Sequence, residues 1–130
     1  MPRRAPTNRP TEAECSILSV VWEKGRVTVR QVHEALAPTS GVGLTTVLKL
    51  MQIMVEKGIL ERDSSVRPQV FRAAQPRRRT QRELLRDLAE RVFSGSPGNL
   101  ALEALSLKKA SPDELEEIRA LLDRLERDAR

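Results

Sequence analysis

The chain has 130 residues, a formal net charge of +5 and a single cysteine, Cys15. This length favours one domain, or one small domain with an appendage, and one cysteine excludes a disulfide within the chain, as in proteins of the reducing cytoplasm. No apolar run approaches the ~20 residues of a transmembrane helix, and residues 1–10 lack the apolar segment of a secretory signal. We therefore expect a cytoplasmic protein with no membrane partner.

The charge is unevenly distributed along the chain. Residues 1–100 carry 17 Lys and Arg against 10 Asp and Glu, a net +7, whereas residues 101–130 carry 6 against 8, a net −2. A basic body with an acidic end is typical of a nucleic-acid-binding protein that dimerises through its far end. A net positive charge can also serve only to keep a protein soluble, so charge alone does not identify a nucleic-acid-binding protein. The sequence motifs have to distinguish the two explanations.

Residues 1–10 are rich in Pro and Arg and are interpreted as a flexible basic arm. Arg3, Arg4 and Arg9 would allow such an arm to reach a minor groove. A loose terminal tail is the commoner explanation of such a composition.

The first predicted helix begins at a capping box, because Thr11 is followed three residues later by Glu14. It runs to about Lys24 and ends at Gly25. Its apolar stripe includes Trp22, the only tryptophan of the chain, which we expect in the core. Cys15, in the first turn, is interpreted as a small packing or surface residue, since a reactive thiol needs an electropositive setting.

The second predicted helix is short. Arg26 and Val27 precede it and are expected to pair briefly as a strand edge. Thr28 and Gln31 form its cap, and Pro38 is expected to close it. His33, the only histidine, is placed on its surface. A loop over residues 38–43 is expected to follow.

The third predicted helix, over residues 43–58, is expected to enter a DNA groove. Its apolar arc at 100° per residue contains Leu44, Val47, Leu48, Leu50, Met51, Met54 and Val55, and its polar arc contains Thr45, Thr46, Lys49, Gln52 and Glu56. Short hydroxyls let a helix approach closely, and Lys and Gln reach base edges or phosphates. The alternative is an ordinary amphipathic helix with a solvated face.

Two short strands are predicted next, over residues 59–63 and 69–73, because apolar and polar residues nearly alternate there. The turn between them, residues 64–68, carries Arg67, which is expected to reach phosphate or the minor groove. Arg30, Arg62 and Arg72 are further expected phosphate contacts. The order of three helices and a hairpin predicts a winged helix-turn-helix, which is more specific than any single motif.

Beyond Pro76 the pattern is wholly helical. Three helices are expected, with the first capped by Thr80 and Glu83 and ended by Gly95, and the others beginning at Ser96 and Ser111, each followed by a proline. Their apolar stripe is expected to form a dimer interface, because helices this short cannot bury their leucines within one chain. The dimerisation residues are Leu84, Leu88, Val92, Leu105, Leu115, Ile118, Leu122 and Leu125.

The predicted fold class is therefore mostly α with a small β-hairpin wing. The predicted domains are a basic arm over residues 1–10, a winged-helix DNA-binding domain over residues 11–75 and a helical dimerisation domain over residues 76–130. The alternative for the second domain is that its stripe packs back on the first.

The sequence resembles the BlaI/MecI/CopY penicillinase-repressor family of bacterial transcription regulators, from Thr11 to about Leu125. The resemblance rests on residues 11–14 with Leu18 and Trp22, on residues 45–52, 56–62 and 70–72, and on residues 111–118. It implies a homodimeric repressor on a two-fold-related operator, with DNA contacts at Thr45, Thr46, Lys49 and the wing around Arg67.

Three departures from the family pattern affect what the resemblance implies. Some members have Arg where Leu48 and Ile53 stand here, so the operator sequence is expected to differ. Glu103 and Ala104 occupy the place of the Asn-Phe bond at which the resistance repressors are cut, and the paired C-terminal cysteines of the copper-responsive branch are lacking. The inducing signal or protein, the operator and the regulated genes therefore stay open.

The sequence predicts a DNA-binding regulator rather than an enzyme, because one His, one Cys and no glycine-rich phosphate loop leave nothing to assemble into an active site. No metal and no cofactor are expected. The alternative function is a winged-helix protein-interaction module without sequence-specific DNA binding.

Overall fold

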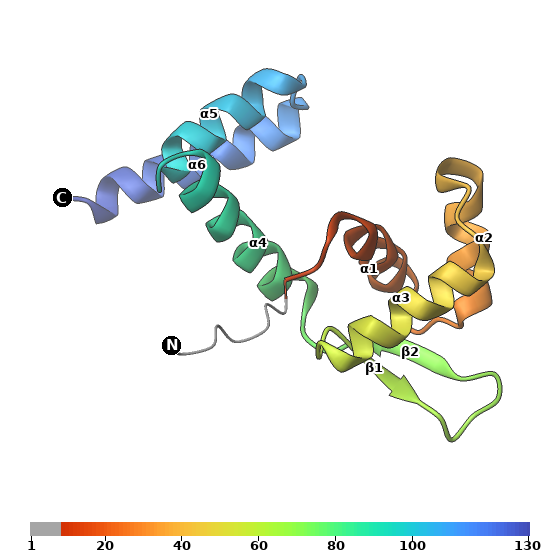
Figure 1. Ribbon diagram of the computed structural model, residues 1–130. Helices are drawn as coiled ribbons and strands as arrows, with labels where there is room; N and C mark the ends of the chain where they lie inside the picture. The colour runs from red at the N-terminus through yellow and green to blue at the C-terminus, as the bar shows by residue number, and fades with distance from the viewer. Residues whose placement is uncertain (1–8) are drawn as a thin grey trace. The chain divides into compact units, whose positions relative to one another are not determined.

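The computed structural model describes residues 9–130 as six helices and one two-stranded antiparallel sheet (Figure 1). The elements are α1 (Glu12–Lys24), α2 (Val29–Ser40), α3 (Leu44–Glu56), β1 (Leu60–Asp63), β2 (Val70–Ala73), α4 (Arg77–Val92), α5 (Pro97–Leu107) and α6 (Pro112–Asp128). The predicted fold class is confirmed. The prediction of a flexible arm concerns residues that lie, apart from Arg9 and Pro10, outside the described part of the chain.

Side-chain caps begin α1, α2 and α6 where the sequence predicts them. The Thr11 hydroxyl accepts a hydrogen bond from the Glu14 N–H at 3.2 Å, and the Glu14 carboxylate accepts one from the Thr11 N–H at 2.9 Å. The same reciprocal arrangement holds at Thr28 with Gln31 and at Ser111 with Glu114. Because each cap satisfies N–H groups that have no partner within the helix, it sets the residue at which the helix starts.

The expected end of the second helix at Pro38 is wrong. α2 continues through Pro38 to Ser40, and Gly41 follows in the left-handed conformation with φ 66°. The Ser40 hydroxyl donates to the Leu36 carbonyl at 2.9 Å, and the Gly41 N–H donates to the Ala37 carbonyl at 3.1 Å. These bonds keep the last turn helical, so the turn to α3 consists of residues 41–43 and is shorter than the expected loop.

The expected capping box at Thr80 is also wrong. α4 begins at Arg77, and Thr80 lies inside its first turns with only 4% of its surface exposed. Its hydroxyl accepts a hydrogen bond from the Gln75 side-chain amide at 2.9 Å, and the Pro76 carbonyl accepts from the N–H groups of Arg79 and Thr80. Pro76 thus starts the helix earlier than the Thr–Glu spacing predicts.

The hydrophobic core lies between α1, α2, α3 and the hairpin. α1 contributes Ile17, Leu18, Val20 and Val21, α2 contributes Val32, α3 contributes Val47, Met51 and Met54, and the hairpin and its flanks contribute Val27, Ile59, Leu60 and Phe71. Trp22, which we expected in this core, lies half-buried at its edge. The Arg77 guanidinium lies 5.6 Å from the centre of the Trp22 ring, as in a cation–π contact.

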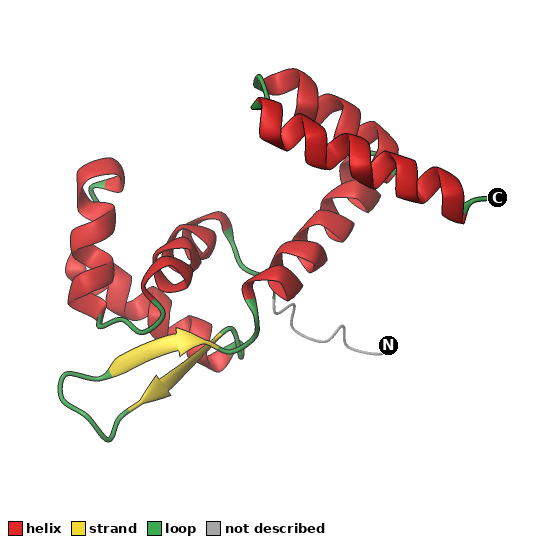
Figure 2. Ribbon diagram, turned by 180° about the vertical axis from the view of Figure 1, so that it is seen from behind, coloured by secondary structure: helices red, strands yellow, loops and turns green. Residues whose placement is uncertain are grey.

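The hairpin pairs Leu60 with Ala73 and Asp63 with Val70 (Figure 2). Val27 adds the expected strand edge, since it exchanges two backbone hydrogen bonds with Phe71, at 3.0 and 2.7 Å. α1, α2, α3 and this hairpin, in this order, form a winged helix-turn-helix.

Residue contacts divide the chain into two units that meet between Leu84 and Leu85, inside α4. The second unit contains the rest of α4 with α5 and α6, and neither α5 nor α6 contains a fully buried residue. Among the described residues, no helix is long and apolar enough to cross a membrane.

Candidate nucleic-acid interface

The outward face of α3 carries the polar side chains that the sequence assigns to DNA. Thr45, Thr46, Lys49 and Gln52 are all exposed, whereas Val47, Met51 and Met54 on the opposite face are fully buried. The buried residues fix the rotation of α3 about its axis, so the four polar side chains point away from the core. The opposing faces therefore lie as the periodicity predicts.

Two leucines of α3 are not where the sequence analysis places them. Leu44 and Leu48 belong to the predicted apolar arc, yet they are 39% and 40% exposed. Leu44 lies in the first turn and Leu48 at the border of the arc, and the core contacts of α3 run along Val47, Met51 and Met54 instead. The border position of Leu48, next to Thr45 and Gln52 around the helix, was the available signal in the sequence.

Leu44 and Leu48 line a shallow hollow of about 410 Å³. Its other apolar walls are Val29 of α2 with Pro68 and Phe71 of the hairpin. Its polar lining residues are Thr28, Arg30, Thr45 and Gln69. The hollow therefore connects the exposed face of α3 with the first turn of α2 and the second strand.

The turn of the hairpin, residues 64–69, extends beyond the paired strands (Figure 2). At its base the Ser65 hydroxyl and the Ser65 N–H both donate to the Asp63 carboxylate. These two bonds, the hydroxyl first, and the nearby Arg26 lower the pKa of Asp63 below its usual value. Arg67, the predicted wing contact, is exposed in this turn.

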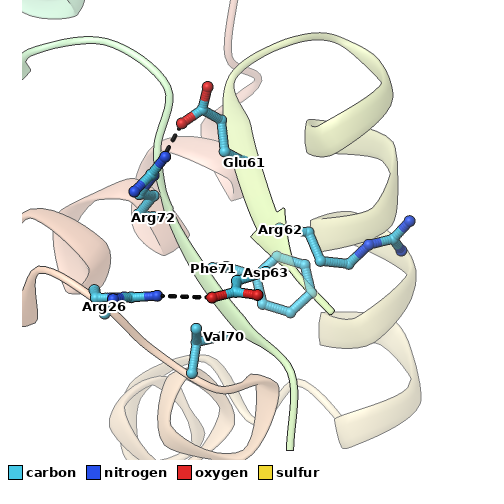
Figure 3. A pocket seen from close by; sticks show the side chains of 7 residues that line it. All are labelled: Arg26, Glu61, Arg62, Asp63, Val70, Phe71 and Arg72. Carbon is cyan, nitrogen blue, oxygen red and sulfur yellow. Dashed lines mark hydrogen bonds and ion pairs between the residues drawn. The ribbon is translucent and has the colours of Figure 1, made fainter. Parts of the chain in front are cut away.

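Two ion pairs cross one face of the hairpin (Figure 3). Arg72 lies 2.9 Å from Glu61 on the neighbouring strand, and Arg26 lies 3.1 Å from Asp63. The charge of Arg72 is thereby balanced within the hairpin, which weakens its assignment as a phosphate contact. Arg62 is exposed and points away from both pairs.

Arg30 is exposed in the first turn of α2 and borders the hollow beside Leu44. Arg30, Lys49 and Arg67 therefore belong to three different elements of the winged unit. The sequence analysis assigns all three to phosphates or bases, and that assignment stays a prediction.

A buried ion pair links α1 to the end of α3. Lys57 Nζ lies 2.7 Å from Glu14 Oε1, and the Glu14 side chain is only 2% exposed. The same carboxylate oxygen accepts the cap bond from the Thr11 N–H. One buried carboxylate thus serves both the helix cap and the contact between α1 and α3, which positions the α3 face.

Among the described residues, neither Cys15 nor His33 belongs to a cluster of side chains that could hold a metal ion. Burial, and then the carboxylates of Glu14 and Glu12, raise the pKa of Cys15 above its ordinary value. His33 is half-buried on α2. Within residues 9–130, no three His, Cys, Asp or Glu side chains are grouped to hold a metal ion.

The fold and the exposed polar face of α3 are those of a DNA-binding winged-helix protein. The sequence model of the penicillinase repressor family matches residues 10–124, which is most of the chain. The chain therefore belongs to the penicillinase repressor family of transcriptional regulators.

No curated protein sequence gives a significant match to the chain. Among solved structures, a MarR family transcriptional regulator from Silicibacter pomeroyi DSS is similar at 18% identity and a TM-score of 0.43, over 86% of this chain and 65% of that one. BpsR of Bordetella bronchiseptica, described in a study of how 6-hydroxynicotinic acid regulates its DNA binding, is similar at 20% identity and a TM-score of 0.46, over 94% and 83%. The present chain thus spans 65% of the length of the first of these structures.

Proposed function

We propose that the protein is a homodimeric repressor that binds a two-fold-related operator through α3 and the hairpin turn. The observation that carries the proposal is the exposed face of α3, where Thr45, Thr46, Lys49 and Gln52 stand opposite a fully buried apolar face. In a winged helix this face enters the major groove, where side chains of these types bind base edges and phosphates.

Within this proposal each basic residue has a distinct role. Lys49 binds guanine or a phosphate, and Thr45 and Thr46 bind phosphate oxygens or contact a thymine methyl. Arg67 on the turn, with Arg30 and Arg62, neutralises phosphates on either side of α3. Each neutralised phosphate releases a counterion, so the affinity falls steeply as salt rises.

The dimer in this proposal forms through α4, α5 and α6. Leu88, Val92, Leu115, Leu122 and Leu125 are between 38% and 63% exposed in the single chain. The proposed interface also includes Leu84, Leu105 and Ile118. Covering apolar side chains of this size stabilises an assembly by about 1.5–3 kcal/mol for each one fully buried, and two-fold dimers are the commonest way to cover them. A dimer places two α3 helices on half-sites about one helical turn of DNA apart, or slightly further.

The test uses fragments of the host genome that the full-length protein retains in a pull-down. Lys49→Ala is expected to lower the affinity for the best fragment by about 1–3 kcal/mol if Lys49 binds a base. Lys24→Ala, at an exposed lysine on the last turn of α1, is the matched control and is expected to bind almost as the parent protein does.

Two outcomes would contradict the proposal in different ways. If no fragment is enriched over random DNA, the protein does not recognise a DNA sequence, and a protein-interaction module becomes the better explanation. If a fragment is enriched and Lys49→Ala binds it as tightly as the parent protein does, α3 is not the reading element.

A further inference from the structure

Leu44 and Leu48 lie four residues apart, so their side chains are neighbours along one edge of α3. Both are about two-fifths exposed, at 39% and 40%, although they are large apolar residues among polar ones. Apolar surface that is rimmed by polar groups in this way marks a place where another molecule binds. The described part of the first unit covers these two side chains only in part.

The surroundings of the two leucines restrict which molecule this is. Among residues 9–130, Arg30 is the only charged residue that lines this hollow, and no carboxylate lines it. Thr28 and Thr45 add hydroxyl groups to the lining. The apolar surface is therefore bordered by one cationic group and two hydroxyl groups, which favours a polyanion that carries apolar groups between its charges.

Duplex DNA meets that description at one base. In the major groove only thymine presents an apolar group, its C5-methyl, and that methyl is contacted by apolar side chains, whereas the other base edges present hydrogen-bonding groups. A leucine at the edge of a groove-facing helix buries its own surface and that of the methyl together. Opposite any other base it would cover a polar edge without supplying a hydrogen bond, which is unfavourable.

We propose that Leu44 and Leu48 select thymine by binding its C5-methyl group in the major groove. The inference rests on the proposed function, because it requires that the α3 face meets DNA. Leu44 and Leu48 are then specificity-determining residues, while Thr45 and Lys49 supply hydrogen bonds and charge on the same turns. The operator half-site accordingly contains thymines where these two side chains approach.

Uracil supplies a direct test, because it pairs with adenine as thymine does but lacks the C5-methyl. The full-length protein first selects duplexes from a randomised pool, and the enriched duplex is then synthesised with thymine or with uracil at one position at a time. Loss of one buried methyl is expected to lower the affinity about fourfold, or about fifteenfold when both half-sites are changed together.

Three variants assign that loss to particular side chains. Leu48→Ala and Leu44→Ala are each expected to abolish the uracil penalty at one thymine position and to retain it at the other. Gln52→Ala, on the same exposed face, is the matched control: it is expected to weaken binding to the thymine and uracil duplexes equally, so the full penalty remains. Circular dichroism melting of each variant shows that the fold is retained.

The possible failures are distinguishable. If no duplex is enriched, the proposed function itself fails and this inference fails with it. If a duplex is enriched but thymine and uracil forms bind equally, or if the double variant Leu44→Ala/Leu48→Ala keeps the full penalty, the DNA-binding function stands and the assignment of the leucines is wrong. If the double variant binds DNA as tightly as the parent protein does, the two leucines do not contact DNA, and the hollow binds a partner other than DNA.

Discussion

Glu14 and Lys57 show how one buried charge depends on a partner that is distant in the sequence. Their atoms are 2.7 Å apart, and the carboxylate is 2% exposed. Lys57→Met removes the cation and leaves Glu14 buried, so we expect the free energy of unfolding to fall by about 2–4 kcal/mol, near the lower end of the penalty for breaking a buried pair, because Lys57 is partly exposed. Urea unfolding of the full chain measures this loss.

The matched control for that variant is Arg72→Met. Its partner Glu61 and Arg72 itself are more than half exposed, at 54% and 60%, so solvent already screens the pair. We expect a loss below about 1 kcal/mol. If the free energy of unfolding falls equally in the two variants, the burial of Glu14 does not strengthen the contribution of its ion pair to stability.

Cys15 is expected to react slowly with alkylating agents. Burial and the carboxylates of Glu14 and Glu12 raise the pKa of its thiol, so a smaller fraction is the reactive thiolate at any given pH near neutrality. At pH 8 the native protein should consume iodoacetamide more slowly than the same protein in urea, and the rate should keep rising above the pH at which a free cysteine levels off. A native rate equal to the unfolded rate would exclude this protection.

At the scale of the elements, the hairpin holds one arginine in an ion pair and leaves another exposed in its turn. Arg72 is tied to Glu61 across the strands, whereas Arg67 is exposed in the turn (Figure 3 shows the former). Arg67→Ala is expected to lower the slope of log affinity against log salt by about one per bound protomer, since one counterion fewer is released. Arg72→Ala is expected to leave the slope unchanged, and fluorescence anisotropy across a salt series measures both. If the parent protein, Arg67→Ala and Arg72→Ala have identical slopes, Arg67 does not contact DNA phosphates.

At the scale of the whole molecule, the proposed dimer depends on the apolar stripe of α6. Leu122 is 51% exposed in the single chain, so Leu122→Glu places a charge on the stripe without disturbing a core. We expect this variant to sediment as a monomer and to lose most of its affinity for DNA, because one protomer holds only one half-site. Ala120→Glu adds the same charge on the opposite face of α6 and should remain dimeric. If Leu122→Glu remains dimeric, the dimer interface does not include this part of α6.

Much of the secondary structure follows from the sequence because it is encoded locally. The caps at Thr11, Thr28 and Ser111 lie three residues before the side chains that complete them, and such short-range signals mark helix starts without knowledge of the fold. The two strands appear within one residue of the predicted ranges for the same reason. The resemblance to the penicillinase repressors, carried by these local motifs, is confirmed by the family match.

Only the tertiary structure decided which side chains are covered. Periodicity places Leu44 and Leu48 on an apolar arc, but whether another element packs over that arc depends on residues far along the chain, such as Phe71. The same holds for the pairing of Glu14 with Lys57, for the balanced charge of Arg72, and for Thr80, which bonds to Gln75 and does not cap a helix. Burial and pairing are properties of neighbours in space, so local pattern indicates where most elements start, while packing determines which surface is left exposed.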